Sequence, residues 1–280
     1  MDQALFRKFC KLAHDKAGIH LKEGKESLVQ ARVAKRLRAL GLDHPREYLE
    51  YMERDESGEE LVLFLDVIST NFTNFFREPD HFDVLAEDVK RLVLEKGRRR
   101  IRLWSAASSS GEEPYTMAIT VLEALEGAPA DFRILATDIS TRMLARAEEG
   151  VYAAGRLEGV PKAFRHKYFE RIGRRGSEEE SYRIRPAVRE RVVFRRLNLA
   201  DPPFPMQGPL DVVFCRNVMI YFDQPVRQRL VSEIERLLAP GGLLCIGHSE
   251  TLSTVKNHLK YIRSSVFRNS VDAEVLQGAS

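Results

Sequence analysis

The chain has 280 residues, of which 44% are hydrophobic and 30% charged, and its formal net charge is +3. This size allows one large domain or two unequal ones, and so weak a basic excess does not by itself indicate a nucleic-acid-binding protein. The cysteines are few and far apart and the histidines lack zinc-binding spacing, so we expect no disulfide scaffold and no metal site. The N-terminus lacks a signal-peptide pattern and no run of about 18 apolar residues occurs, which predicts a cytoplasmic protein.

The first 76 residues are predicted to form an all-helical domain. An apolar stripe at helical spacing begins at Phe6, Gly41 is a typical helix stop, and Pro45 is a typical helix start. Further helices are expected over 25–40, 45–54 and 58–68. A helical linker over residues 77–97 is expected to follow.

From residue 98 to residue 272 the pattern changes to short apolar runs that alternate with helical segments. Apolar runs predict strands at 101–106, 132–137, 192–197, 210–215 and 242–246, with helices at 112–126, 141–149 and 224–238. This alternation predicts an α/β fold with a doubly wound, Rossmann-like parallel sheet covered by helices on both faces. A small antiparallel β-subdomain is expected at about 160–191, a turn at 239–242 before the last strand, and a loose tail over 273–280.

A turn of small residues follows the first predicted strand and ends at Gly111, where a helix begins. Small side chains let a ligand approach the backbone, and the helix N-terminus offers free N–H groups. Glu112 and Glu113 come next and would repel a phosphate, so the turn suits a cationic or hydroxyl-rich ligand such as the methionine part of S-adenosylmethionine. An ordinary turn, with acids that favour the helix dipole, explains the same residues.

Polar residues also follow the next strands. Asp138 ends the second strand, where an acid commonly accepts hydrogen bonds from ribose hydroxyls, although it could be only the N-cap of the following helix. The Asn198 amide suits the edge of an adenine. Arg216 and Asn217 follow the fourth strand, at an edge where parallel sheets bind ligands. Each residue alone could satisfy local backbone groups, but together they predict a nucleoside site.

The segment 70–78, TNFTNFFRE, alternates polar and aromatic residues without a clear helix or strand period. Its phenylalanines could pack as a plug between the two domains. Asn71, Thr73 and Arg77 could line a pocket beside that plug.

With these residues in hand, the chain resembles the CheR family of chemotaxis receptor methyltransferases over nearly its whole length. The motifs that carry the resemblance are TNFTNFFRE at 70–78, WSAASSSGEEPY at 104–115, ATDIS at 136–140, LNLADPPFP at 197–205, VVFCRNVMIYFD at 212–223 and LLAPGGLLCIGHSE at 237–250. Together they are far more specific than a lone glycine motif.

The resemblance implies transfer of a methyl group from S-adenosylmethionine to glutamate side chains of chemoreceptors. The products would be glutamyl methyl esters and S-adenosylhomocysteine. The family's cofactor-binding residues fall on Asn71, Thr73, Arg77, Glu112, Asp138, Asn198, Leu199, Arg216 and Asn217 of this chain, and Tyr221 matches an active-site tyrosine.

The implied reaction is chemically reasonable without a general base. Glutamate has an ordinary pKa near 4.3, so its carboxylate is already a nucleophile at neutral pH. Alignment and desolvation should then supply most of the acceleration. Our hypothesis gives Arg77 and Tyr221 the task of orienting the acceptor carboxylate or the methionine end of the cofactor.

The implied partner is the cytoplasmic domain of a chemoreceptor. Arg32, Lys35 and Arg36 share one side of a predicted helix and could contact the acidic methylation helices of a receptor, although a solvated helix face explains them equally well. Some family members dock a receptor C-terminal pentapeptide on a glycine-rich loop of the β-subdomain. The corresponding loop at 172–180 has fewer glycines and more charge, so the resemblance does not extend to that loop.

Two other functions are consistent with parts of the pattern. One is a methyltransferase that acts on a small molecule or on RNA, but no basic patch with interleaved aromatics supports RNA, and we expect no nucleic-acid partner. The other is a cofactor-binding sensor without turnover. A monomer is the default expectation.

Overall fold

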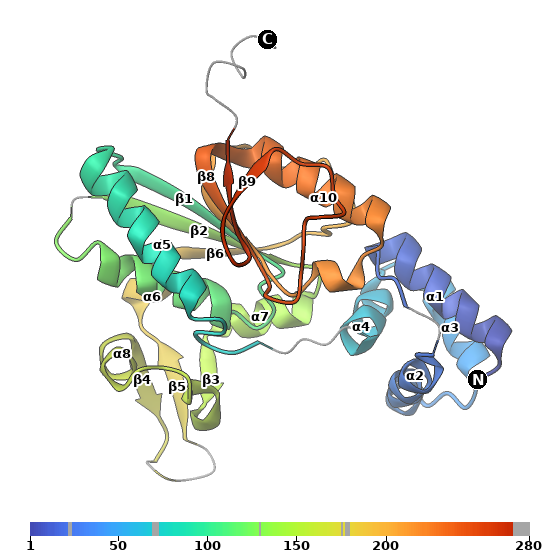
Figure 1. Cartoon of the computed structure of the whole chain (residues 1–280). Helices are drawn as coiled ribbons and strands as arrows, with labels where there is room; N and C mark the ends of the chain where they lie inside the picture. The colour runs from blue at the N-terminus through green and yellow to red at the C-terminus, as the bar shows by residue number, and fades with distance from the viewer. Residues whose placement is uncertain (22–23, 69–72, 129, 175, 177–179, 271–280) are drawn as a thin grey trace.

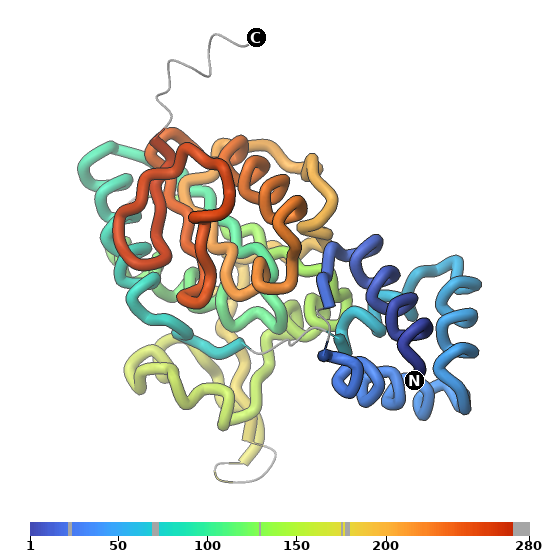
Figure 2. Tube along the Cα trace, turned by 45° about the vertical axis from the view of Figure 1, so that its right-hand side comes forward, coloured from blue at the N-terminus to red at the C-terminus, as the bar shows by residue number. Residues whose placement is uncertain are grey.

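The computed structural model describes residues 1–21, 24–68, 73–128, 130–174, 176 and 180–270. Four helices form the N-terminal domain, which lies beside the larger sheet domain in both views (Figures 1 and 2). They are α1 (Gln3–Ala17), α2 (Glu26–Leu40), α3 (Pro45–Arg54) and α4 (Glu59–Ile68). The predicted helices of this domain are therefore confirmed, including the stop at Gly41, which has the left-handed φ of 68° that a glycine adopts readily.

The helical domain has its own core. The rings of Phe9, Tyr48 and Phe64 pack against one another with centroids 5.5–6.2 Å apart. Buried Glu60 accepts hydrogen bonds from the Tyr48 hydroxyl at 2.7 Å and from the Arg36 guanidinium at 2.7 and 2.8 Å. Glu60 is thus paired, as burial of a charge requires.

The larger domain is built on a seven-stranded sheet in the order β6-β2-β1-β7-β8-β10-β9. The first five in that order are parallel: β6 (Val192–Arg196), β2 (Asp131–Asp138), β1 (Arg100–Ala106), β7 (Leu210–Cys215) and β8 (Leu238–Ile246). A hairpin of β9 (Leu259–Arg263) and β10 (Val266–Asn269) completes the edge in antiparallel fashion and was not predicted.

Helices cover both faces of this sheet (Figure 1). Alternate residues of β1 face opposite sides: Ile101 and Leu103 pack with α5 (Asp80–Lys90) and α6 (Glu112–Ala124), and Trp104 packs with α10 (Gln224–Leu237). The residues expected as a linker form α5 and a π-helical turn, η1 (Arg91–Glu95), and their buried apolar side chains, such as Leu85, Val89 and Leu92, belong to the core of the sheet domain. Helix α7 (Thr141–Glu149) follows β2 within the residues predicted for it.

The predicted turn before the last strand is wrong. Residues 239–242 lie within β8, which begins at Leu238 directly after α10. The pairing with β7 shifts register between Leu210 and Val212, whose partners are Leu238 and Leu243. The extra residues form an irregularity in the strand instead of a separate turn.

A three-stranded antiparallel sheet forms the predicted β-subdomain, which projects from the sheet domain on the side away from the chain's C-terminus (Figure 1). Its strand order is β3-β5-β4, and it begins at Val151, earlier than expected. Its elements are β3 (Val151–Ala153), η2 (Ala154–Leu157), α8 (Lys162–Tyr168), β4 (Phe169–Ile172) and β5 (Ser181–Ile184), after which α9 (Pro186–Arg189) leads back to β6. None of the described helices is both long and apolar enough to cross a membrane.

Candidate active site

A cavity lies at the carboxyl edge of the parallel sheet, where ligands of doubly wound folds bind. Its sheet-side wall comes from residues at or after four neighbouring strand ends: Ala107 and Ser109, Asp138, residues 197–199, and residues 216–218. Thr73, Asn74 and Arg77 line it from the segment between the domains, and Ala17 and Ile19 from the helical domain. Both domains therefore contribute to one cavity.

Strained backbone surrounds this cavity. Five of the non-glycine residues with positive φ lie in it or next to it: Phe76, Glu78, Ala107, Ser109 and Asn217, with φ between 46° and 63°. Such conformations cost energy and concentrate at functional sites, where the surrounding structure holds them. The turn after β1 is thus a shaped wall and not merely a flexible connection.

Asp138 ends β2 and is held from both sides by backbone. One carboxylate oxygen accepts the N–H of Ser109 at 2.8 Å, and the other accepts the N–H of Ser140 at 2.9 Å. The adjacent helix α7 is capped by the Ser140 side chain, so Asp138 is not its N-cap. Burial raises the pKa of Asp138 above its usual value, while the two N–H groups oppose that shift. A carboxylate oxygen has two lone pairs, so one that accepts an N–H can also accept from a ligand hydroxyl.

Arg216 lines the cavity, and its side chain is only 1% exposed. Its guanidinium pairs with Glu78 at 2.9 Å and with Glu113 at 3.1 Å, and it also donates to the carbonyl of Arg77. It lies over the rings of Phe82 and Phe214 at 5.6 and 5.5 Å. The planar fork can hold two carboxylates from distant segments at once, which a lysine cannot do in the same geometry.

Asn217 turns the chain sharply after Arg216. Its φ is 58°, and its backbone N–H donates to Glu250 at 2.9 Å. Gly247 at the end of β8 donates to the same Glu250 oxygen at 2.6 Å, and a Cβ on Gly247 would lie 2.4 Å from the Asn217 amide nitrogen. Only glycine fits there, so the turn after β7 packs directly against the end of β8.

The helical domain holds the loop that carries Tyr221. The backbone N–H of His20 donates to the carbonyl of Tyr221 at 2.7 Å, and Ile19 forms an antiparallel β-bridge with Phe222. Nearby, the His14 ring contacts Asp223, the N-cap of α10, at 2.8 Å. The position of Tyr221 in the cavity wall therefore depends on contacts across the domain boundary.

The structure brings together most of the predicted cofactor residues. Thr73, Arg77, Asp138, Asn198, Leu199, Arg216, Asn217 and Tyr221 all line the cavity. The Asn198 side chain is partly used already, because its amide donates to the Lys16 carbonyl at 2.9 Å and its oxygen accepts the N–H of Ala200 at 3.1 Å. Asn71 lies outside the described residues.

Glu112 is placed differently from the prediction. It is fully buried but does not line the cavity, and it forms an ion pair with Arg156 of the β-subdomain. Glu113 lines the cavity instead, with one oxygen accepting from the Ser105 hydroxyl at 2.7 Å. Adjacent positions on a helix face directions about 100° apart, and here Glu113 faces the cavity while Glu112 faces Arg156.

The predicted basic docking face is smaller than expected. Arg36 is bound to Glu60 by two hydrogen bonds, and its side chain is only 16% exposed, so it belongs to the interior of the helical domain. Lys35 is exposed and Arg32 half-buried on the same helix. These two remain as candidate receptor contacts.

Comparison with known proteins decides the family. Residues 4–69 match the family model described as CheR methyltransferase, all-alpha domain, and residues 71–268 match CheR methyltransferase, SAM binding domain. The chain belongs to the CheR methyltransferase family. The two matches meet between α4 and α5, so α5 falls within the SAM-binding domain.

Curated CheR relatives cover nearly the whole chain. The chemotaxis protein methyltransferase of Salmonella typhimurium is 38% identical over 272 residues, which are 97% of this chain and 92% of that protein. The Escherichia coli protein of the same name is 37% identical, covering 97% and 93%. Chemotaxis protein methyltransferase 2 of Pseudomonas aeruginosa is 41% identical over 250 residues, covering 89% and 87%.

The cavity of this CheR protein fits S-adenosylmethionine, the cofactor of its matched domain. Asp138 supplies acceptor oxygens for hydroxyl groups, and buried Leu199 supplies an apolar surface for a base. The charged lining residues are two acids, Asp138 and Glu113, and two arginines, Arg77 and Arg216, which suits the mixed charges of S-adenosylmethionine better than a phosphate alone. The small residues Ala107 and Ser109 keep the turn close to whatever the cavity holds.

Sequence reasoning missed several residues of this CheR site. Ala17 and Ile19 belong to the helical domain, and no local pattern indicates that they reach the cavity. Asn74 and Glu78 flank predicted residues, and Glu78 lies at a sequence distance of 138 from its partner Arg216. The positive φ of Glu78 gives no signal in the sequence because glutamate is not a residue that marks such turns.

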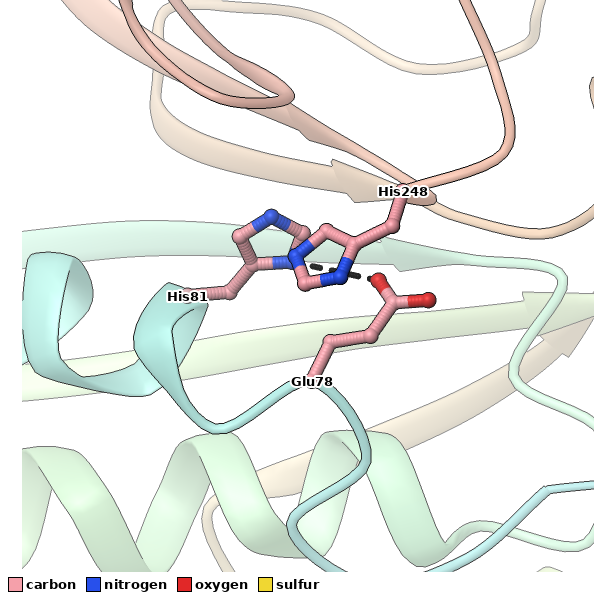
Figure 3. A group of neighbouring side chains, drawn as sticks. All are labelled: Glu78, His81 and His248. Carbon is pink, nitrogen blue, oxygen red and sulfur yellow. Dashed lines mark ion pairs between the residues drawn. The ribbon is translucent and has the colours of Figure 1, made fainter.

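Glu78 also belongs to a cluster with His81 and His248 (Figure 3). Their nitrogen and oxygen atoms lie within 4.8 Å of one another, and His81 Nδ1 is 3.5 Å from a Glu78 oxygen. The Glu78 oxygens already accept from Arg216 at 2.9 Å and from the Asn217 amide at 3.3 Å. We therefore assign the guanidinium of Arg216 as the cation that balances Glu78.

His81 gives a prediction about pH and stability. It is fully buried, and burial together with the Arg216 charge lowers its pKa to about 4, although Glu78 and Asp80 oppose that shift. In the unfolded chain its pKa is near 6.5, so between those values the unfolded state binds a proton that the folded state does not. His81 thus supports full stability above about pH 6.5 and costs up to about 3 kcal/mol as the pH falls to 4.

The measurement is denaturant unfolding of the parent and His81→Phe proteins between pH 7 and pH 4. Among the described residues neither ring nitrogen of His81 has a hydrogen-bond partner, so a phenylalanine loses no such bond. The stability of the parent should fall relative to that of the variant as the pH drops. A difference that stays constant over this range would contradict the assignment of a neutral, buried imidazole.

Proposed function

We propose that this CheR methyltransferase transfers the methyl group of S-adenosylmethionine to glutamate side chains in the cytoplasmic domains of chemoreceptors. The relatives that support this carry the name chemotaxis protein methyltransferase and align over nearly their full length. The products are glutamyl methyl esters and S-adenosylhomocysteine. A cytoplasmic monomer that meets the membrane only through its receptors is the setting we propose.

One observation carries the choice of a carboxylate acceptor. Among the described residues that line the cavity there is no histidine, lysine or cysteine that could deprotonate an amine or an alcohol. The two lining acids are engaged, Asp138 with backbone N–H groups and Glu113 with Arg216 and Ser105. An acceptor that is already an anion at neutral pH needs no base, and glutamate is such an acceptor.

The proposed roles follow from where the side chains lie. The cofactor, when bound, supplies a methyl group activated by a sulfonium. Asp138 binds the ribose hydroxyls, Leu199 and Asn198 border the adenine, and Arg216 holds Glu113 and Glu78 in place behind the cavity. Thr73 and Asn217 complete the cofactor wall. Asn71, which lies outside the described residues, is a cofactor residue on the strength of the family resemblance alone. Arg77 and Tyr221 orient the acceptor carboxylate or the methionine end.

Labelled cofactor tests the reaction type. The protein is incubated with a receptor cytoplasmic fragment and cofactor that carries tritium in its methyl group. We expect label on the receptor fragment that mild base releases as methanol, because esters hydrolyse in base and N-methyl groups do not. Label that resists base, or transfer to RNA in place of the fragment, would refute the proposal.

Arg77 and Tyr221 give the second prediction. Tyr221→Phe removes only a hydroxyl, and Arg77→Ala removes a half-buried charge at the cavity wall. If these groups align the reactants, each change should lower kcat on receptor fragments roughly ten- to a hundredfold while cofactor binding changes less. Unchanged turnover in both variants would show that Arg77 and Tyr221 do not align the reactants.

Arg32 and Lys35 give the third prediction. If they contact acidic receptor helices, the double charge reversal Arg32→Glu, Lys35→Glu should raise the KM for receptor about tenfold and leave the KM for cofactor unchanged. Arg54→Glu is the matched control, because Arg54 is an exposed arginine on another helix of the same domain. Equal effects on both KM values, or an equal effect of the control, would contradict docking on this helix.

A further inference from the structure

The β-subdomain is in direct contact with residues 107–111, the turn between β1 and α6, which we call the cofactor turn. The hydroxyl of Tyr152 in β3 donates to the backbone carbonyl of Ser110 at 2.7 Å. The guanidinium of Arg156 in η2 pairs with Glu112, whose other oxygen accepts from the Ser110 hydroxyl at 2.7 Å. Two side chains of the β-subdomain therefore hold the residues on either side of Gly111.

These contacts lie one residue away from the cavity. Ser109 lines the cavity and donates its N–H to Asp138, and Ser110 follows it. Gly111 has a φ of 94°, and a Cβ there would lie 2.9 Å from the Tyr152 hydroxyl and 2.8 Å from the Ala147 Cβ. The turn is thus pressed against Tyr152 with no room to relax, and its shape depends on that contact.

Glu112 is placed to transmit a change in Arg156. It is fully buried at the first residue of α6, and Arg156 is the cation that balances it. A buried carboxylate left without its partner must find water or another donor, which requires the chain around it to move. The turn of residues 107–111 directly precedes Glu112, so a displacement of Glu112 would change the shape of that turn.

A second wall of the cavity also rests on the β-subdomain. The Phe75 ring packs edge-on against Tyr152 at 4.9 Å and against Phe169 at 5.4 Å between centroids. A Cβ on Gly159 would lie 2.9 Å from the Phe75 carbonyl, so the backbones are in contact as well. Phe75 lies between Asn74 and Arg77, which line the cavity. The turn of residues 107–111 and the segment 74–77 therefore both pack against the β-subdomain.

We infer that Tyr152 and Arg156 are positioning residues for the cofactor, and that the β-subdomain sets the shape of the cofactor turn through them. This inference rests on the proposed cofactor site. Neither residue lines the cavity, so both act through Ser110 and Glu112. By linkage, a partner whose binding displaces β3 or η2 would change cofactor affinity, and the cofactor would change the affinity of that partner by the same factor.

The test compares two ion pairs that join the β-subdomain to the same helix. Arg156 pairs with Glu112 at the start of α6, and Lys167 pairs with Glu123 near its end at 2.9 Å. S-adenosylhomocysteine is titrated calorimetrically into Arg156→Met, Tyr152→Phe and Lys167→Met, and thermal unfolding is recorded for each. We expect Kd to rise about tenfold in Arg156→Met and several-fold in Tyr152→Phe, and to change less than twofold in Lys167→Met.

Kinetics separate positioning from general damage. In Arg156→Met the KM for cofactor should rise while kcat at saturating cofactor stays near that of the parent, and Arg156→Lys should recover part of the affinity. If Kd is unchanged in both Arg156→Met and Tyr152→Phe, or if Lys167→Met raises it equally, the inference is overturned.

Asp138→Asn tests the cofactor site separately from the positioning role of the β-subdomain, because Asp138 lines the cavity itself. If Asp138→Asn binds S-adenosylhomocysteine as tightly as the parent, the cavity is not the cofactor site and both proposals fall. If Asp138→Asn weakens binding and the β-subdomain variants do not, only the positioning role falls.

Discussion

Replacing Arg216 by methionine is expected to reduce methyl transfer at least about a hundredfold and to destabilise the folded protein by about 3–5 kcal/mol. The guanidinium is almost completely buried and balances Glu78 and Glu113, so its removal leaves two carboxylates in a poorly solvated place. Burial raises the pKa of Glu113, and Arg216, together with the Ser105 hydroxyl, opposes that shift. Without that charge the two acids repel each other, and the cavity wall between them changes shape.

The measurement is turnover on receptor fragments together with denaturant unfolding. Arg216→Lys should retain part of the stability but not the activity, because an ammonium cannot bridge both acids and the Arg77 carbonyl as the fork does. Arg268→Met is the matched control: Arg268 pairs with Asp88 in the same domain and does not line the cavity. An Arg216→Met protein with normal turnover would show that the ion pairs of Arg216 with Glu78 and Glu113 are not needed for methyl transfer.

Replacing Asp138 by asparagine is expected to weaken binding of S-adenosylhomocysteine roughly 30- to 100-fold, which corresponds to about 2–3 kcal/mol. The carboxylate accepts N–H groups from Ser109 and Ser140, and an amide can accept on one side only. The substitution therefore disturbs the turn after β1 as well as the oxygen proposed to bind ribose. Both effects act on the cofactor and neither changes the receptor surface.

Calorimetric titration measures this affinity directly. Asp131→Asn is the matched control, since Asp131 lies at the opposite end of β2 and pairs with Arg191 at the surface. We expect the control to bind as the parent does. A normal Kd for Asp138→Asn, or equal losses in both variants, would contradict the ribose-binding role.

The parallel sheet could be predicted because its strands are apolar runs with clear ends. β7 is buried at every position, and a run such as LDVVFC followed by Arg216 shows where the chain leaves the core. The β9–β10 hairpin was missed because β9 is largely exposed, so its hydrophobic pattern is weak. The start of β8 was missed because Pro240 and Gly241 suggest a turn, whereas the strand passes through them as an irregularity.

Within the site, the sequence indicated which positions follow strand ends but not which partners they meet. Arg36 was predicted to be free because its helix face looks basic, yet it meets Glu60 of a helix 24 residues away. Arg156 pairs with Glu112 and Arg216 pairs with Glu113, and these contacts from different elements determine which of the two acids faces the cavity. Such contacts depend on tertiary placement, which spacing along one helix does not contain.

A crystal structure with S-adenosylhomocysteine would show whether the cofactor binds in the cavity shared by both domains. We expect ribose hydroxyls within hydrogen-bond distance of the Asp138 carboxylate, the adenine beside Leu199, and the sulfur end toward Tyr221 and Arg77. A nucleoside bound outside this cavity, or a ribose held by Glu112 in place of Asp138, would contradict it.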